Sequence, residues 1–170
     1  MKLTVTNNQL YSFGEWLGKV KQGIANKEIT TSKMFTFFVS TLVSRIKDDM
    51  VNLQETMSYE NESYDEFKHK LGLIQSEYKS AYEKLEVKAI NQEIEDDFIS
   101  KGQALEDEYR DVLDAVKKHN TEVSELMGSE VEVDLPQVSF KILPDDITEY
   151  GTILLQLFKE SEEEIFEMVG

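Results

Sequence analysis

The stretch SKMFTFFVSTLVSRIKDDMVNLQETM, residues 32–57, decides the fold of this chain. Apolar side chains recur in it at steps of three or four residues, which places them on one stripe of an α-helix rather than on one face of a strand. The seven members of the stripe are Phe35, Val39, Leu42, Ile46, Met50, Leu53 and Met57. Such a helix would extend about 39 Å at about 1.5 Å per residue, so its stripe needs partners along the whole length.

Similar stripes on both sides of this stretch predict further helices. One runs from Leu10 to Val20, with Asn7 or Asn8 as its expected N-cap, and another occupies residues 67–85 after the polar segment SYENESYDE. Two long helices joined by a short polar loop should fold back on each other. We therefore expect residues 32–57 and 67–85 to form a long antiparallel helical hairpin.

The periodicity shifts to a different face between residues 87 and 102, where helix and loop both stay open. A third stripe, from Leu105 to Leu126, then predicts one helix that ends near Gly128. A last helix is expected from Asp145 or Asp146 to Phe158.

Alternating apolar residues predict three short strands, KLTVT at 2–6, EVEVDL at 130–135 and VSFKIL at 138–143. The simplest arrangement pairs the N-terminal strand with the strands near 130–143 in a small antiparallel sheet, although Pro136 interrupts the ladder between them. The predicted fold class is therefore mainly α (α+β). We expect a single helical domain in residues 1–158 and an acidic extension in residues 159–170.

The composition is strongly acidic, with 18 basic and 34 acidic residues and a formal net charge of −16. Residues 1–58 carry 7 basic and 5 acidic residues, a net of +2, whereas residues 59–170 carry 11 and 29, a net of −18. A phosphate backbone would be repelled by the second part, so we expect no direct binding of nucleic acid and a protein partner with a basic surface. The chain has no cysteine, no signal-peptide pattern and no long apolar run, so a cytoplasmic protein that does not enter membranes is expected.

Residues able to carry chemistry are scarce. The two histidines, His69 and His119, stand in polar helical stretches without metal-ligand spacing, and no Gly-rich phosphate loop or nucleophile elbow is present. The carboxylates near residue 95 lack the layout of a calcium loop. The sequence therefore predicts a non-enzymatic protein without metal or cofactor. Aromatic side chains near residues 11–16 and 35–38 have the spacing of core residues rather than of a platform for stacking bases.

Clustered carboxylates are the one feature with a physical route to function, because a dense array can imitate phosphates toward a basic cleft. The candidate partner-binding residues are Glu93, Glu95, Asp96, Asp97, Glu106, Asp107, Asp111, Asp114, Glu162, Glu163 and Glu164. Glu106, Asp107, Asp111 and Asp114 are expected on one outer face of the third helix. The alternative is that this acidity only keeps the surface solvated.

The segments MKLTVTNNQLYSF and EVEVDLPQVSFKILPDDI, together with the charged helical middle, resemble a family of small proteins of unknown function from bacteriophages and prophages of low-GC Gram-positive bacteria. Residues 1–20 and 130–158 carry the resemblance, while a longer middle (87–128) and the acidic tail depart from it. It implies a phage origin and the cytoplasm of a bacterial host, but no site residues.

Two functional hypotheses follow. The first is an acidic inhibitor that binds a host nucleic-acid-handling or defence protein. The alternative is a virion morphogenesis or tail-assembly factor whose helices bind a phage structural protein or form a homo-oligomer.

Overall fold

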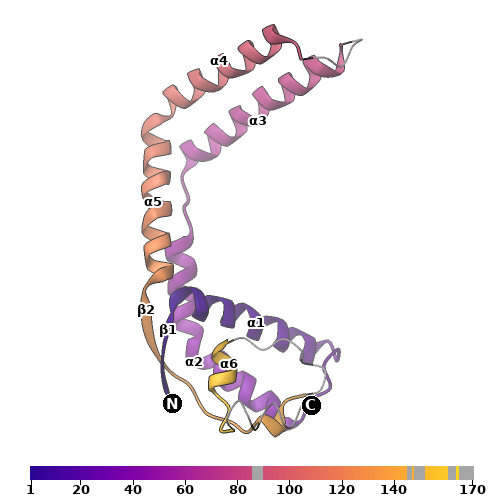
Figure 1. Cartoon of the computed structure of the whole chain (residues 1–170), viewed down its shortest axis with the longest axis vertical. Helices are drawn as coiled ribbons and strands as arrows, with labels where there is room; N and C mark the ends of the chain where they lie inside the picture. Colours follow the sequence, from indigo (N-terminus) through magenta and orange to yellow (C-terminus); the bar gives the residue numbers. More distant parts are fainter. Residues whose placement is uncertain (86–89, 145–146, 148–151, 161–163, 165–170) are drawn as a thin grey trace. The chain divides into compact units, whose positions relative to one another are not determined.

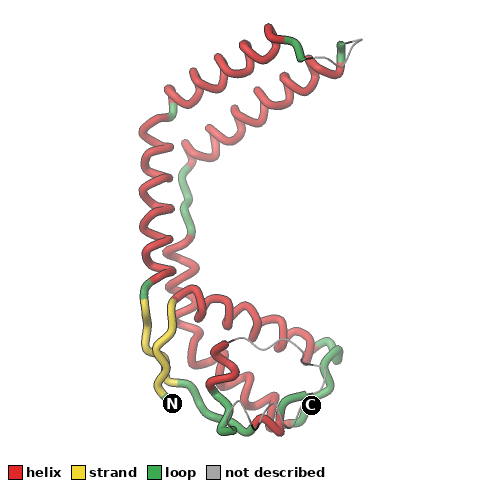
Figure 2. The backbone as a smooth tube through the Cα atoms, viewed as in Figure 1, coloured by secondary structure: helices red, strands yellow, loops and turns green. Residues whose placement is uncertain are grey.

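A computed structural model describes residues 1–85, 90–144, 147, 152–160 and 164. Helices dominate these residues, and two short strands accompany them (Figures 1 and 2). The elements are β1 (Lys2–Thr6), α1 (Asn7–Ala25), α2 (Lys33–Met57), α3 (Glu62–Glu83), α4 (Gln92–Glu108), α5 (Arg110–Gly128), β2 (Glu130–Asp134), the 3-10 helix η1 (Phe140–Ile142) and α6 (Thr152–Gln156). The predicted mainly α fold with a small antiparallel sheet is confirmed.

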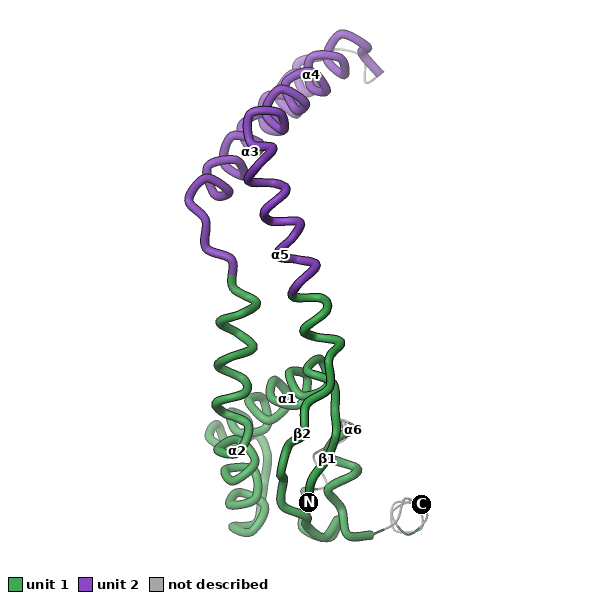
Figure 3. The backbone as a smooth tube through the Cα atoms, turned by 90° about the vertical axis from the view of Figure 1, so that its left-hand side faces the viewer, with its two compact units in different colours: residues 1–58, 123–170 green, residues 59–122 purple. Residues whose placement is uncertain are grey.

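The chain folds into two compact units (Figure 3). Unit 1 contains residues 1–58 and 123–170, and unit 2 contains residues 59–122, so the boundary at residue 122 falls within α5. Compact units are defined by internal packing and not by independent folding. The expected single domain in residues 1–158 with an acidic extension therefore stays a prediction.

The stripe of α2 forms the centre of the unit 1 core, as predicted. Ser32 caps this helix by accepting a hydrogen bond from the Phe35 amide. Phe35 and Leu42 are fully buried, and the side chains of Met50 and Met57 are half-buried at the far end. Helix α1 packs against α2 and buries the apolar residues Leu10, Phe13, Leu17 and Val20.

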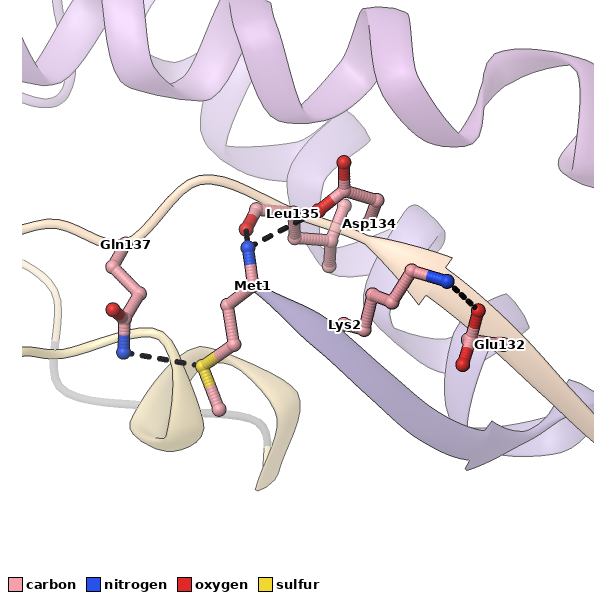
Figure 4. A network of polar contacts seen from close by, with 6 residues as sticks. All are labelled: Met1, Lys2, Glu132, Asp134, Leu135 and Gln137. Atoms are coloured by element: carbon pink, nitrogen blue, oxygen red, sulfur yellow. Dashed lines mark hydrogen bonds and ion pairs between the residues drawn. The ribbon is translucent and has the colours of Figure 1, made fainter.

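The predicted pairing of the N-terminal strand is also confirmed. β1 pairs antiparallel with β2, with Lys2 opposite Asp134 and Val5 opposite Val131. Beside the ladder, the amino group of Met1 donates to the Leu135 carbonyl at 2.8 Å and to Asp134 Oδ1 at 3.1 Å (Figure 4). The sheet thus joins two segments that are about 130 residues apart in the chain.

The prediction of a strand at residues 138–143 is wrong. In the described part of the chain, Val138 makes an isolated parallel bridge to Phe158, and η1 follows at once. The reason is that side chains take the hydrogen bonds that a strand ladder would use. The Glu160 carboxylate accepts from the Phe140 amide at 2.8 Å and from the Ser139 hydroxyl.

The prediction that residues 32–57 and 67–85 form a hairpin names the wrong helix partners. Within unit 1, α2 packs on α1, and within unit 2, α3 packs on α4. Contacts between α3 and α4 run antiparallel, from Tyr78–Glu95 near one end to Lys70–Glu108 at the other. Any apolar stripe can cover another, so the periodicity identifies the buried face but not the helix that covers it.

Two further expectations need correction. The helix expected over residues 105–128 is divided at Tyr109, whose backbone leaves the helical region (φ −108, ψ 19) between α4 and α5. The N-cap of α1 is Thr6, in a capping box with Gln9, and not Asn7 or Asn8.

The last helix was expected to run to Phe158, but α6 ends at Gln156, and neither Ile147 nor Phe158 is helical. Phe158 instead forms the bridge to Val138. Asp145, Asp146 and residues 161–163 lie outside the described residues.

Candidate protein-interaction surface

Helix α4 concentrates the negative charge of unit 2. Between Gln92 and Glu108 it carries seven carboxylates and one cation, Lys101. Asn91 caps the helix by accepting from the amides of Glu93 and Ile94, and the acidic residues of the first turn complement the helix dipole. The opposite, apolar face of α4 packs on α3.

Three predicted carboxylates on α4 are exposed, namely Glu93, Asp96 and Asp107. Helical geometry places Asp96 and Asp107 on the side opposite the inward-facing Phe98 and Leu105, and Glu93 at the border between that side and the face that meets α3. Asp96 accepts a hydrogen bond from the side-chain Nε2 of Gln92 at 2.8 Å, and Asp107 pairs with Arg110. Such exposed pairs are weak and exchange readily with other cations.

Glu95, by contrast, is half-buried between α3 and α4. Its Oε1 accepts hydrogen bonds from the hydroxyls of Tyr82 at 2.6 Å and Tyr78 at 2.7 Å. These bonds, first that of Tyr82, lower the pKa of Glu95, and the bond to Glu95 raises the pKa of Tyr78 to about 12. The Tyr82 oxygen also accepts from the Asn91 amide at 3.1 Å. Glu95 therefore connects α3 to the start of α4.

Asp97 lies at the side of α4, where Lys101 bridges the two helices. The Lys101 ammonium contacts Asp97 at 2.9 Å on its own helix and Glu77 of α3 at 3.2 Å. The hydrogen bonds that the Lys101 ammonium donates to Asp97 and, with a smaller effect, to Glu77 raise the pKa of Lys101. All three side chains are well exposed, so another cation can compete for these carboxylates.

The acidic face expected to run through residues 106–114 is not one helical face. Glu106 and Asp107 lie on α4, whereas Asp111 and Asp114 lie on α5, beyond the break at Tyr109. The Tyr109 ring is buried, 5.7 Å from the ring of Phe67, and the Lys70 ammonium lies 4.9 Å from it. All four carboxylate residues are exposed.

The carboxylates near the C-terminus are described only in part. Glu164 is exposed, and Glu162 and Glu163 lie outside the described residues.

A groove that was not predicted from the sequence runs between α3 and α4. Its volume is about 810 Å³, and we call it the α3–α4 groove. Its apolar lining is formed by Leu73, Ile74, Ala81, Ile94 and Phe98, and its polar lining includes Glu77, Lys84, Glu93, Asp97 and Lys101. Leu73 is 53% exposed. Ile74 and Ala81 belong to the apolar stripe expected over residues 67–85, whereas Leu73 lies outside that stripe.

The two histidines and the aromatic residues considered for base stacking differ in their exposure to solvent. His69 is exposed, whereas His119 is half-buried with its ring 4.8 Å from that of Tyr59. Phe13, Phe35 and Phe38 are buried, which confirms the core interpretation for them, while Phe37 is 74% exposed.

No group of three potential ligands that could hold a metal ion occurs within the described ranges. None of the helices in those ranges has both the length and the hydropathy needed to span a membrane. The chain matches no family model, no curated protein and no solved structure.

Proposed function

We propose that this chain is a non-enzymatic protein-binding module, and that helix α4 recognises a basic surface of its partner. The observation that supports the proposal most directly is the charge of α4, with seven carboxylates against Lys101. Its residues Glu93, Asp96 and Asp107 are exposed to an approaching partner. Carboxylates arranged along a helix attract a cationic surface over about a Debye length and orient its approach.

The resemblance to phage proteins supports a role for this module in an infected bacterial cell. A basic surface on a host protein is commonly one that handles nucleic acid, because that function requires attraction to phosphates. An acidic module that covers such a surface would compete with nucleic acid and inhibit the host protein. The proposed partner is therefore a nucleic-acid-handling or defence protein of the host.

The test compares two charge-reversal variants that change the net charge equally. The first combines Glu93→Lys, Asp96→Lys and Asp107→Lys on α4. The control combines Glu15→Lys, Asp48→Lys and Glu55→Lys, which are exposed residues of α1 and α2. Each immobilised chain is used to capture proteins from infected and uninfected host lysates, and the captured proteins are identified by mass spectrometry.

We expect the native chain and the control to retain the same partner, and the α4 variant to lose it. Binding should weaken as salt is raised from about 0.05 to about 0.5 M, because salt screens charge pairs. Equal retention by both variants would contradict the proposal. Binding that does not respond to salt would instead favour an assembly factor that uses apolar helix surface.

A further inference from the structure

The α3–α4 groove has an exposed apolar lining next to a row of charges. Leu73, Ile74 and Ala81 of α3 face Ile94 and Phe98 of α4 across it. Leu73 leaves 53% of its surface in water, and covering such a side chain is favourable for any partner with a matching apolar face.

The charges around the groove indicate which occupant fits it. Glu77, Glu93 and Asp97 line it together with Lys84 and Lys101, and residues 59–122 carry 17 acidic and 9 basic residues, a net of −8. A second copy of the chain, with its own net charge of −16, would be repelled. A cationic occupant is attracted, and its ammonium groups can replace Lys101 beside Asp97 and Glu77.

The shape of the groove also favours one kind of element. α3 and α4 are antiparallel helices that lie side by side (Figure 1). The depression between two packed helices accepts a third helix, whose apolar residues at steps of three and four fill it. We infer that the α3–α4 groove receives a cationic amphipathic helix of the partner, an inference that rests on the proposed protein-binding function.

The experiment uses the full chain and three synthetic peptides of about 18 residues, or five helical turns. The first has leucines at steps of three and four and lysines elsewhere. The second has the same composition in scrambled order, and the third replaces the lysines of the first by glutamates. Fluorescence anisotropy gives the affinity of each peptide at low and high salt.

Two variants of equal exposure separate the groove from the rest of the hairpin. Leu73→Ser removes an apolar residue of the groove, and the matched control Ile99→Ser removes one that is 51% exposed on α4 outside the groove. Circular dichroism verifies that both variants keep their helices. We expect the Leu/Lys amphipathic peptide to bind at least about tenfold more tightly than the scrambled one. Leu73→Ser should reduce this advantage by about tenfold, and Ile99→Ser by less than about twofold.

The remaining outcomes distinguish the two proposals. If both lysine peptides bind equally and Leu73→Ser does not change their affinity, the inference about the α3–α4 groove is wrong, while the proposed acidic binding surface is still supported. If no lysine peptide binds even at low salt, both proposals fail. Equal binding of the glutamate peptide would overturn the charge argument for the groove. Sedimentation of the chain alone completes the test, because a dimer abolished by Leu73→Ser would show that the occupant is a second copy.

Discussion

Asn7 is a buried polar residue at the start of α1, and its side-chain nitrogen donates two hydrogen bonds. Its Nδ2 donates to the Leu126 carbonyl at 2.9 Å and to the Ser129 hydroxyl at 3.0 Å. Its backbone amide donates to the Ser129 carbonyl at 3.0 Å. One residue therefore connects the start of α1 to the end of α5 and the turn before β2. The neighbouring Asn8 is chemically identical but exposed.

We predict that Asn7→Ala lowers the free energy of unfolding by about 1–3 kcal/mol, because it leaves buried polar groups with fewer partners. Asn8→Ala should change it by less than about 0.5 kcal/mol, as is usual for an exposed site. Urea unfolding followed by circular dichroism measures both values. Similar losses for the two variants would show that the Asn7 contacts add nothing to stability.

At the scale of elements, the apolar periodicity was sufficient to predict which face of a helix is buried. The stripe of α2 could be predicted because burial depends on which residues share a face, and Phe35 and Leu42 are fully buried. The helix that packs against each stripe could not be predicted, because one apolar stripe can be covered by any other. The strand expected at residues 138–143 failed for a different reason, since Glu160, some twenty residues away, takes its hydrogen bonds.

In the candidate site, too, some features could be predicted from local sequence and others depend on contacts between helices. The exposure of Asp107 could be predicted from its place opposite the apolar stripe of the expected third helix, whereas no helical register was predicted for Glu93 and Asp96. The tyrosines that hold Glu95 come from another helix, 13 and 17 residues earlier in the chain. The α3–α4 groove likewise requires two helices in a defined register, which only the tertiary structure provides.

The Glu160 carboxylate should make the C-terminal part of unit 1 sensitive to acid. Hydrogen bonds from the Ser139 hydroxyl and then from the Phe140 amide lower the pKa of Glu160. A group whose pKa is lower in the folded state stabilises the fold above its unfolded pKa of about 4.3. This contribution is lost as the pH falls through the lower, folded-state pKa.

We therefore predict that Glu160→Gln destabilises the protein near neutral pH and that its difference from the native chain shrinks as the pH falls below the unfolded pKa of about 4.3. Urea midpoints measured across this pH range provide the readout. Glu130→Gln, at an exposed position of β2, serves as the control. A difference between Glu160→Gln and the native chain that is constant with pH would argue against the carboxylate as the cause.

At the scale of the whole molecule, the acidic charge is divided equally between the two units. Unit 1 and unit 2 each contain 9 basic and 17 acidic residues, a net of −8. Within unit 1, however, residues 1–58 have a net of +2 and residues 123–170 a net of −10. Lys2 and Glu132 pair across the sheet that joins these segments of opposite charge.

Unit 1 should fold without unit 2. We predict that replacing residues 59–122 by a Gly/Ser linker of about nine residues, with a span of about 15–18 Å, leaves a folded protein. Tyr59 and His119, near the two ends of the excised segment, have ring centroids 4.8 Å apart, so a short linker suffices. The core of Phe35, Leu42 and Val133 remains complete.

The shortened chain should unfold in one cooperative urea transition and give dispersed amide signals in NMR spectra. It should also lose the basic partner, because α4 is absent. Collapsed NMR signals without a cooperative transition would mean that unit 1 depends on unit 2. Retained partner binding would place the binding surface elsewhere.

The pairing of β1 with β2 has a consequence for the newly made protein. Translation proceeds at about 5–20 residues per second, so the roughly 80 residues between the end of α2 and Leu135 take about 4–16 s to synthesise. During that interval β1 has no strand to pair with, and the apolar face of α2 is covered only by α1. Nascent chains should therefore be a substrate for ribosome-associated chaperones until the second strand emerges.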